Sequence, residues 1–354
     1  MLDQIIIRSE VELTFAGNLA PILAYLVWRL IPGFHQYAGH NAHNIRTSPT
    51  RCFPDHPDYM LILDGGLGTE LETRLAKDDP RNPLGNPLWL GQVLLLSPDL
   101  IELIHREYVD AGAEVLVTAT YQLLYDTLIK HKNYTLDEAH NLWNEAIQVA
   151  KRASKPGVMV AGLVGPYATY LADGSEYTGE YNGATVSELR EYHEPLVKYL
   201  NNHPDVDMVA FETIPNRTEL EAVVQVAETL NKKFYVLMNL TLKGLVNGTD
   251  IDDVIRLLEP LRGLLNFLAV GINCCDYKQI ETLAQLMPFP LYVYPNLGYE
   301  YDQTKGFYGV VKDDDAWRAA VEAWSKLPNV EAMGGCCSTG PHEIAIVKEI
   351  VSKE

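Results

Sequence analysis

The chain has 354 residues, of which 47% are hydrophobic and 21% are charged, a composition typical of a globular protein with a large core. Its 28 basic and 47 acidic residues give a formal net charge of −19, which argues against nucleic acid as a partner because phosphate backbones bind basic patches. The five cysteines include two adjacent pairs; this is no disulfide framework, and it favours a reducing compartment, the cytoplasm.

Residues 1–58 differ from the rest of the chain. Residues 13–30 are largely apolar but contain an asparagine, a proline and an arginine, whereas a membrane-spanning helix needs ~20 residues with few charges. The acidic residues near the start argue against a secretory signal or a transit peptide. We predict a poorly ordered N-terminal extension over 1–58 and one folded domain over 59–354; a membrane anchor is the less favoured alternative.

The first predicted strand, residues 59–63, leads into the segment Asp64-Gly65-Gly66-Leu67-Gly68. Glycines let a ligand approach the backbone closely, but the Lys-Ser/Thr pair of a phosphate-binding loop is missing. Asp64 is a candidate for binding an amine, and capping of the next helix is an equally supported alternative. The Pro-, Gly- and Asn-rich segment 77–89 is long enough to form a lid.

Helices and strands alternate through the middle of the chain. A helix that begins after Ser97 contains His105, which we interpret as a packed or surface residue and not as a ligand. Strands are expected over 114–120 and 158–163. Two capping boxes mark the starts of further helices, Thr135-x-x-Glu138 and Thr185-x-x-Glu188.

A cluster of tyrosines follows the strand at 158–163, formed by Tyr167, Tyr170, Tyr177 and Tyr181. Aromatic rings at a strand end could surround a sulfonium or a quaternary ammonium group. Tyrosines also cover protein surfaces, so the cluster assigns no role to any one of them.

Glu212 directly follows a predicted strand at 206–211. A carboxylate after a buried apolar run costs free energy unless it faces a ligand or a partner. Glu212 is therefore a candidate binding residue, and another strand is predicted at 234–238.

Two vicinal cysteine pairs follow the sixth and the eighth predicted strands, in Asn273-Cys274-Cys275 and Gly334-Gly335-Cys336-Cys337. Thiolates from two strand ends could meet and bind zinc, and three of them would leave the open position of a catalytic site. Free cysteines also act as small buried hydrophobes, and the Cys336-Cys337 pair alone supports both interpretations equally. A disulfide within that pair would strain the backbone.

Eight strands are predicted, and most are followed by a helix. Such alternation indicates parallel pairing, and eight units close into an α/β fold, the (β/α)8 TIM barrel. The active site of this barrel lies at the carboxyl ends of the strands, where the polar and thiol residues above are found. The predicted strands end near Asp64, Thr120, Gly165, Glu212, Asn239, Cys274, Asn296 and Cys336.

Taken together and in order, the strand-end motifs resemble the homocysteine S-methyltransferase family over about residues 59–350. The motifs are DGGLGTE from Asp64, TATYQ from Thr118, FETIPN from Phe211, GINC from Gly271, YPN from Tyr294 and GGCC from Gly334. The resemblance implies a Zn²⁺ ion held by Cys274, Cys336 and Cys337. It also implies that Asp64 and Glu212 bind homocysteine.

The resemblance further implies methyl transfer from a sulfonium donor to L-homocysteine, which gives methionine. The chain ends one helix after the last cysteines, as in compact members that use S-methylmethionine, or S-adenosylmethionine less well. We expect small-molecule substrates, no nucleic acid, no membrane partner, and a monomer or small homo-oligomer. The helix N-terminus after Cys337 is expected to bind the substrate carboxylate.

Several alternatives remain at this point. Betaine could be the donor, or selenocysteine the acceptor, and a catalytically silent barrel could sense homocysteine. A zinc hydrolase is disfavoured, because such sites usually use His and carboxylate ligands and the chain has no HExxH motif.

Overall fold

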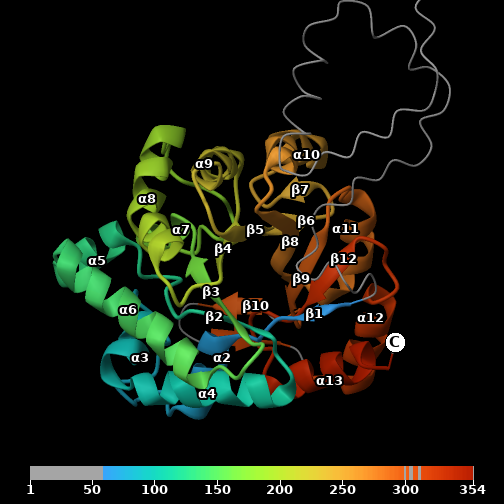
Figure 1. The fold of residues 1–354 in the computed structure, drawn as a ribbon, viewed down its shortest axis with the longest axis horizontal. Helices are drawn as coiled ribbons and strands as arrows, with labels where there is room; N and C mark the ends of the chain where they lie inside the picture. The colour runs from blue at the N-terminus through green and yellow to red at the C-terminus, as the bar shows by residue number, and fades with distance from the viewer. Residues whose placement is uncertain (1–58, 299, 303–305, 310–311, 354) are drawn as a thin grey trace, which may run out of the picture. The chain divides into compact units, whose positions relative to one another are not determined.

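The computed structural model describes residues 59–353, apart from 299, 303–305 and 310–311. The prediction for residues 1–58 lies outside the described residues. Eight strands pair in the order β1-β12-β9-β8-β5-β4-β3-β2. A parallel bridge between Leu63 and Val115 joins the two ends of this order, β1 and β2. The sheet thus forms the predicted α/β barrel, with helices around it (Figure 1).

All eight predicted strands are present, and neighbours are parallel throughout. Two of them run further than predicted, so that Glu212 and Cys274 lie within strands. The barrel strands are β1 Leu61–Ile62, β2 Val115–Val117, β3 Met159–Val164, β4 Met208–Ile214, β5 Lys233–Met238, β8 Phe267–Asp276, β9 Leu291–Asn296 and β12 Val330–Met333.

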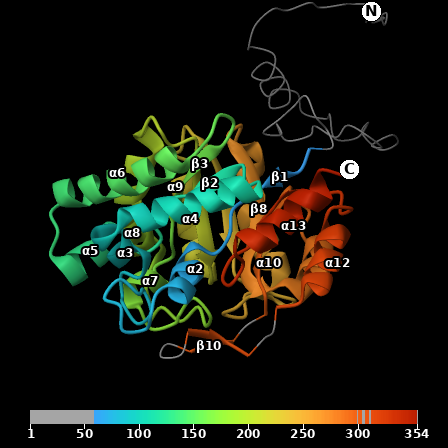
Figure 2. The same ribbon diagram turned by 90° about the horizontal axis from the view of Figure 1, so that it is seen from below.

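Helices follow most strands and cover the outside of the barrel. They are α2 Leu67–Arg74, α3 Leu90–Leu96, α4 Pro98–Ala111, α5 Tyr125–Lys132, α6 Leu136–Ala153, α7 Ala168–Leu171, α8 Val186–Asn202, α9 Arg217–Ala227, α10 Ile251–Leu258, α11 Ile280–Leu286, α12 Asp314–Trp324 and α13 Pro341–Val351. Both predicted capping boxes form, at Thr135 and at Thr185. Helices α4 and α6 pack side by side outside β2 and β3 (Figure 2).

The period-2 alternation of the strands divides the apolar residues into two layers. Leu61, Val117 and Tyr235 belong to a small cluster that fills the barrel interior. Their neighbours Ile62 and Leu116 belong to the larger cluster between the sheet and the helices. Because each strand supplies both layers, the barrel interior is packed and any binding site must lie at one of its ends.

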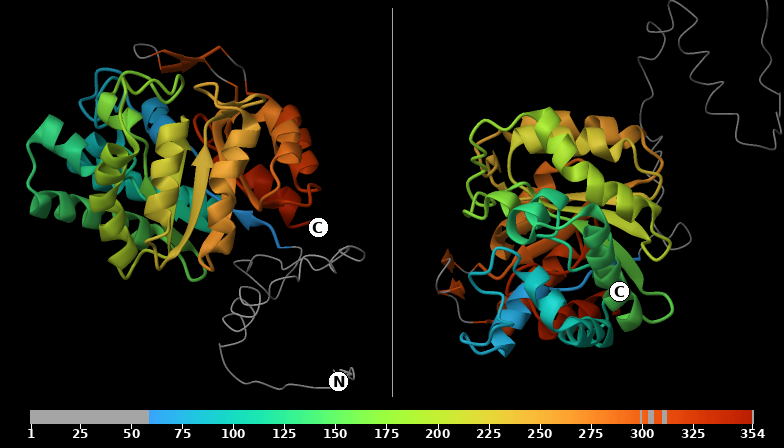
Figure 3. Two further views of the ribbon diagram at one scale, coloured as in Figure 1. Left: turned by 90° about the horizontal axis from the view of Figure 1, so that it is seen from above. Right: turned by 90° about the vertical axis from the view of Figure 1, so that its left-hand side faces the viewer.

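Two short hairpins extend the loops at the carboxyl end of the barrel. They are β6–β7, Leu240–Thr241 with Gly244–Leu245, and β10–β11, Glu300–Asp302 with Gly306–Tyr308. In the left view of Figure 3 the yellow strand points toward the end of the barrel at which β10–β11 lies. Within the described residues, no helix is both long and apolar enough to cross a membrane.

Candidate metal centre

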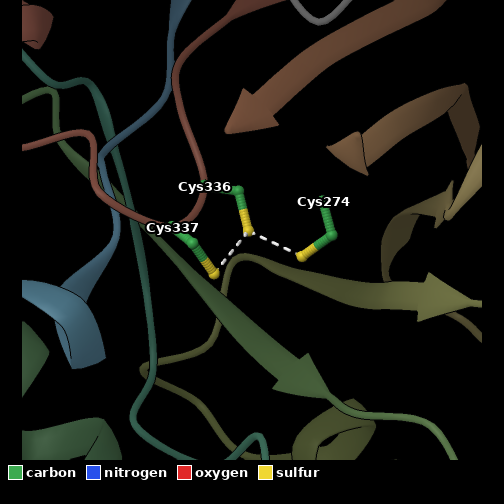
Figure 4. Close-up of side chains that lie close together, drawn as sticks. All are labelled: Cys274, Cys336 and Cys337. Atoms are coloured by element: carbon green, nitrogen blue, oxygen red, sulfur yellow. Dashed lines mark hydrogen bonds between the residues drawn. The ribbon is translucent and has the colours of Figure 1, made fainter. Parts of the chain in front are cut away.

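Three thiols converge at the carboxyl end of the barrel. The Sγ atoms of Cys274, Cys336 and Cys337 lie within 4.8 Å of one another, and Figure 4 shows all three pointing into one volume. Cys336 Sγ is 2.9 Å from that of Cys274 and 3.6 Å from that of Cys337, and all three cysteines are free thiols. Hydrogen bonds from Cys274 and Cys337 hold the pKa of Cys336 well below its usual value, so the cluster favours a thiolate.

A break in the alternation of β8 decides which cysteine of the pair Cys274-Cys275 faces the barrel. A Cβ on Gly271 would contact Leu237 of the interior, whereas Ile272 lies in the outer layer. Strict alternation would place Cys274 outside and Cys275 inside. Instead Cys274 has φ 53°, the register with β9 shifts here, and Cys275 is buried in the outer layer.

The side chain of Asn273 couples the ends of β4 and β8. Its Oδ1 accepts the N–H of Thr213 (3.0 Å), and its Nδ2 donates to the hydroxyl of Thr213 (2.7 Å). Nδ2 also lies 3.7 Å from Cys274 Sγ. Thr213 has φ 63°, so both strands carry a bulge at the same level, a feature common beside functional sites. This bracing residue was not singled out from the sequence, although it directly precedes Cys274.

The loop after β12 that carries Cys336 and Cys337 is fixed on both sides. The N–H of Cys336 donates to the carbonyl of Pro295 (2.7 Å), and the N–H of Gly66 donates to the carbonyl of Thr339 (2.8 Å). A Cβ at Gly66 would lie 2.4 Å from the carbonyl oxygen of Cys336. Only glycine fits at position 66, because the loop after β1 and the loop after β12 approach each other closely there.

Glu212 lies in β4 beside the thiols, and its side chain is 5% exposed. Its Oε1 has no hydrogen-bond partner within the described part of the chain. Burial raises the pKa of Glu212 well above its usual value, and the nearby charges of Cys336 and Asp64 raise it further. A buried acceptor without a partner is costly, so this carboxylate is available to pair with a cationic ligand.

Asp64 is fully buried next to the same cluster. Its Oδ2 accepts the N–H of Val117 (2.9 Å), and its Oδ1 accepts the hydroxyl of Tyr294 (2.7 Å). Burial raises the pKa of Asp64 to about 7, although both hydrogen bonds oppose the shift. The sequence analysis gave no role to Tyr294, the first residue of the YPN motif, which lines the pocket and holds Asp64.

A pocket of about 430 Å³ opens above the thiols, within the size range of small-molecule sites. Gly85, Asn86, Pro87 and Trp89 line it, so the predicted lid segment borders the pocket. Gln122 also lines it, and its buried Oε1 has no hydrogen-bond partner among the described residues.

The four clustered tyrosines, for which a cage and surface packing were both open, do not line the pocket together. Of the four tyrosines, Tyr177 lines the pocket, whereas Tyr167 stacks on Tyr170 and packs edge-on against Tyr181. The hydroxyl of Tyr181 donates to the buried Glu219 (2.5 Å). Aromatic packing in the core thus takes three of the four rings, and the sequence cannot distinguish that role from ligand binding.

The expected anion site at the N-terminus of α13 is wrong. The N–H of Ser338 donates to Thr69 Oγ1 (2.8 Å), and that of Gly340 donates to Glu343 Oε2 (2.6 Å). Pro341 begins the helix and has no N–H. The N-terminus of α2 instead borders the pocket through Gly66 to Thr69, and helix geometry leaves its first N–H groups without partners inside the helix.

Comparisons with known proteins give the family of this chain. A profile of the homocysteine S-methyltransferase family matches residues 61–351. Homocysteine S-methyltransferase 2 of Zea mays is 33% identical over 326 residues, 86% of this chain and 93% of that protein. Selenocysteine Se-methyltransferase of Brassica oleracea var. italica is 33% identical, covering 82% of this chain and 89% of that protein.

A solved structure agrees with these relatives. The metallated form of the homocysteine methyltransferase MmuM from Escherichia coli superposes with a TM-score of 0.69 at 30% identity, covering 85% of this chain and 99% of that one. The profile match spans most of the chain and includes every residue of the thiol cluster. The chain therefore belongs to the homocysteine S-methyltransferase family.

Proposed function

We propose that this protein transfers a methyl group from a sulfonium, S-methylmethionine or S-adenosylmethionine, to the sulfur of L-homocysteine and so forms methionine. The observation that carries the proposal is the group of three thiols beside the unpartnered carboxylate of Glu212. These groups match the two ends of homocysteine, a thiol that a thiophilic metal would bind and an ammonium that a carboxylate would bind. The family relationship gives independent support.

The thiol cluster fits a zinc ion. Tetrahedral zinc with Zn–S bonds of ~2.3 Å places its sulfurs ~3.8 Å apart, near the 3.6 Å between Cys336 and Cys337. The 2.9 Å between Cys274 and Cys336 is shorter, and a small rotation of either side chain would open it. Three protein thiols leave one position for the substrate, and bound zinc would deprotonate the homocysteine thiol near neutral pH. The metallated form of MmuM supports a metal at this site.

The surrounding residues would orient homocysteine. Glu212 Oε1 would accept a hydrogen bond from the substrate ammonium, and the negative charge of Asp64 just below would add to this attraction. The N–H groups at the start of α2, which borders the pocket, would bind the carboxylate. A substrate held at both ends places its sulfur over the thiol cluster.

Methyl transfer then needs no further acid or base from the protein. The homocysteine sulfur attacks the methyl carbon of the sulfonium, a new S–CH3 bond forms, and the old one breaks. Its electron pair stays on the donor sulfur, which leaves as a neutral thioether. Because an anion and a cation become two neutral thioethers, a pocket that is poorer in water than bulk solvent favours the reaction.

A direct assay tests the proposal. Purified protein with zinc is incubated with homocysteine and S-methylmethionine, S-adenosylmethionine or betaine, and methionine is measured. We expect methionine from a sulfonium, and no activity in Cys336→Ser. A Cys336→Ser protein with stoichiometric zinc and full activity would falsify the proposed role of the thiols.

Selenocysteine is a second candidate acceptor, because a relative named for selenocysteine methylation is as similar as those named for homocysteine. The same assay with selenocysteine in place of homocysteine compares the two acceptors by their kcat/KM values.

We also propose that the protein works in the cytoplasm. Thiols 2.9 Å apart would form a disulfide readily in an oxidising compartment.

A further inference from the structure

A second carboxylate, that of Glu176, lines the pocket. It lies in the loop between α7 and α8 and forms no ion pair with any cation of the described residues. Burial raises the pKa of Glu176, and the nearby acidic groups of Asp173 and Glu219 raise it further. Like Glu212, Glu176 is an acid that a cationic ligand would stabilise in its charged form.

The loop that carries Glu176 is fixed by hydrogen bonds. The carbonyl of Glu176 accepts from Asn239 Nδ2 (2.9 Å), and the N–H of Gly179 donates to the carbonyl of Ser175 (2.7 Å). Asn216 Nδ2 donates to the carbonyl of Gly179 (3.1 Å). Because these contacts tie the backbone of the loop to the ends of β4 and β5, Glu176 is held at the pocket without a ligand.

Glu176 and Glu212 reach the pocket from different elements, the loop between α7 and α8 and strand β4. The charges that act on Glu212 are those of Cys336 and Asp64, whereas those that act on Glu176 come from outside the thiol cluster. Tyr121 also lines the pocket. Burial raises its pKa most, followed by the charge of Glu176 and then by that of Cys274.

Tyr177, next to Glu176, lines the same pocket as the three thiols. An aromatic ring in this position can attract a sulfonium through its π-face. Beyond the thiol cluster the pocket therefore offers an aromatic surface and, next to it, a carboxylate.

We propose that Glu176 binds the α-ammonium group of the methyl donor and so selects sulfonium donors that are themselves amino acids. The inference rests on the function proposed above and adds the residue that recognises the donor. Two amino acids, each with an α-ammonium group, must bind at once, and two carboxylates, those of Glu212 and Glu176, line the pocket. A donor without N–H groups on its ammonium, such as betaine with its trimethylated nitrogen, cannot donate a hydrogen bond to the carboxylate of Glu176, which disfavours its binding.

The test compares Glu176→Gln with the wild type and with Glu180→Gln, a matched change at an exposed residue of the same loop that does not line the pocket. The donors are S-methyl-L-methionine and 4-(dimethylsulfonio)butanoate, which is identical except that hydrogen replaces the ammonium. In Glu176→Gln we expect the KM for S-methylmethionine to rise by about 10-fold or more, the loss typical of a charge-assisted hydrogen bond. In Glu176→Gln, the KM for homocysteine and the kinetics with 4-(dimethylsulfonio)butanoate stay at wild-type values. Glu180→Gln has wild-type kinetics with both donors.

Three results would overturn the inference: unchanged kinetics in Glu176→Gln, an equal loss with both donors, or a rise in the KM for homocysteine alone. Calorimetric titration of S-methylmethionine into zinc-loaded protein separates this inference from the proposed function, because it needs no turnover. Weaker binding to Glu176→Gln than to the wild type supports it even where no methionine forms. Equal binding, or no binding to either protein, refutes it.

Discussion

Replacing each member of the vicinal pair in turn tests the break in β8. Cys274 and Cys275 are adjacent, yet Cys274 Sγ lies 2.9 Å from Cys336 Sγ while Cys275 is buried in the outer layer. Cys274→Ala and Cys275→Ala remove the same atom from neighbouring positions. We expect Cys274→Ala to lose zinc and Cys275→Ala to keep it.

The size of the loss follows from the number of ligands. Zinc bound by four ligands gains ~10–16 kcal/mol, which is roughly 3–4 kcal/mol for each, or about a 100- to 1,000-fold change in affinity. Cys275→Ala removes one buried sulfur from an apolar layer and costs stability of about 1 kcal/mol, without an effect on metal affinity.

The assay is zinc per chain by mass spectrometry after equilibration in a chelator buffer of fixed free zinc. Thermal unfolding of both variants checks that each is folded, so that metal loss is not a consequence of unfolding. Loss of zinc in Cys275→Ala with retention in Cys274→Ala would show that β8 keeps its strict alternation and that our assignment is reversed.

Three further predictions concern the pocket, the core and the loop contact. Glu212→Gln should raise the KM for homocysteine by about 10- to 100-fold, the equivalent of ~1.5–3 kcal/mol for a hydrogen bond to a charged group, and an unchanged KM would contradict the role of Glu212. Burial without a partner lowers the pKa of His105 from 6.5 to about 4, so its stabilising neutral form is fully present above pH 6.5 and is lost as pH falls through 4. We expect the free energy of unfolding to fall by about 3 kcal/mol between pH 6.5 and pH 4. Denaturant titrations of His105→Leu should lack this part of the pH dependence. A pH profile equal to that of the wild type would refute the assignment to His105. Gly66→Ala should weaken zinc binding and lower the free energy of unfolding by about 1–3 kcal/mol, because the new Cβ would lie 2.4 Å from the carbonyl oxygen of Cys336. A variant with wild-type zinc content and melting temperature would argue against that contact.

Local signals in the chain were sufficient for most of the fold. Threonine and glutamate three residues apart began α6 and α8 as expected, because a capping box depends only on residues within one helical turn. The barrel followed from the number of strand–helix units, since parallel strands need such crossovers. Local pattern could not separate the pocket-facing Tyr177 from the packed Tyr181, because that difference depends on contacts with distant helices.

The sequence by itself determined the eight strand–helix units, the clustering of polar and thiol residues at strand ends, and the family. The tertiary structure decided which of these residues face one another. Strict alternation would turn Cys274 away from Cys336, and the positive φ of Cys274 together with the bracing by Asn273 turns it inward. Such a bulge depends on hydrogen bonds between strands some 60 residues apart in the chain, which no local pattern encodes. The same holds for Glu176, which lines the pocket from a loop whose backbone is held by distant asparagines.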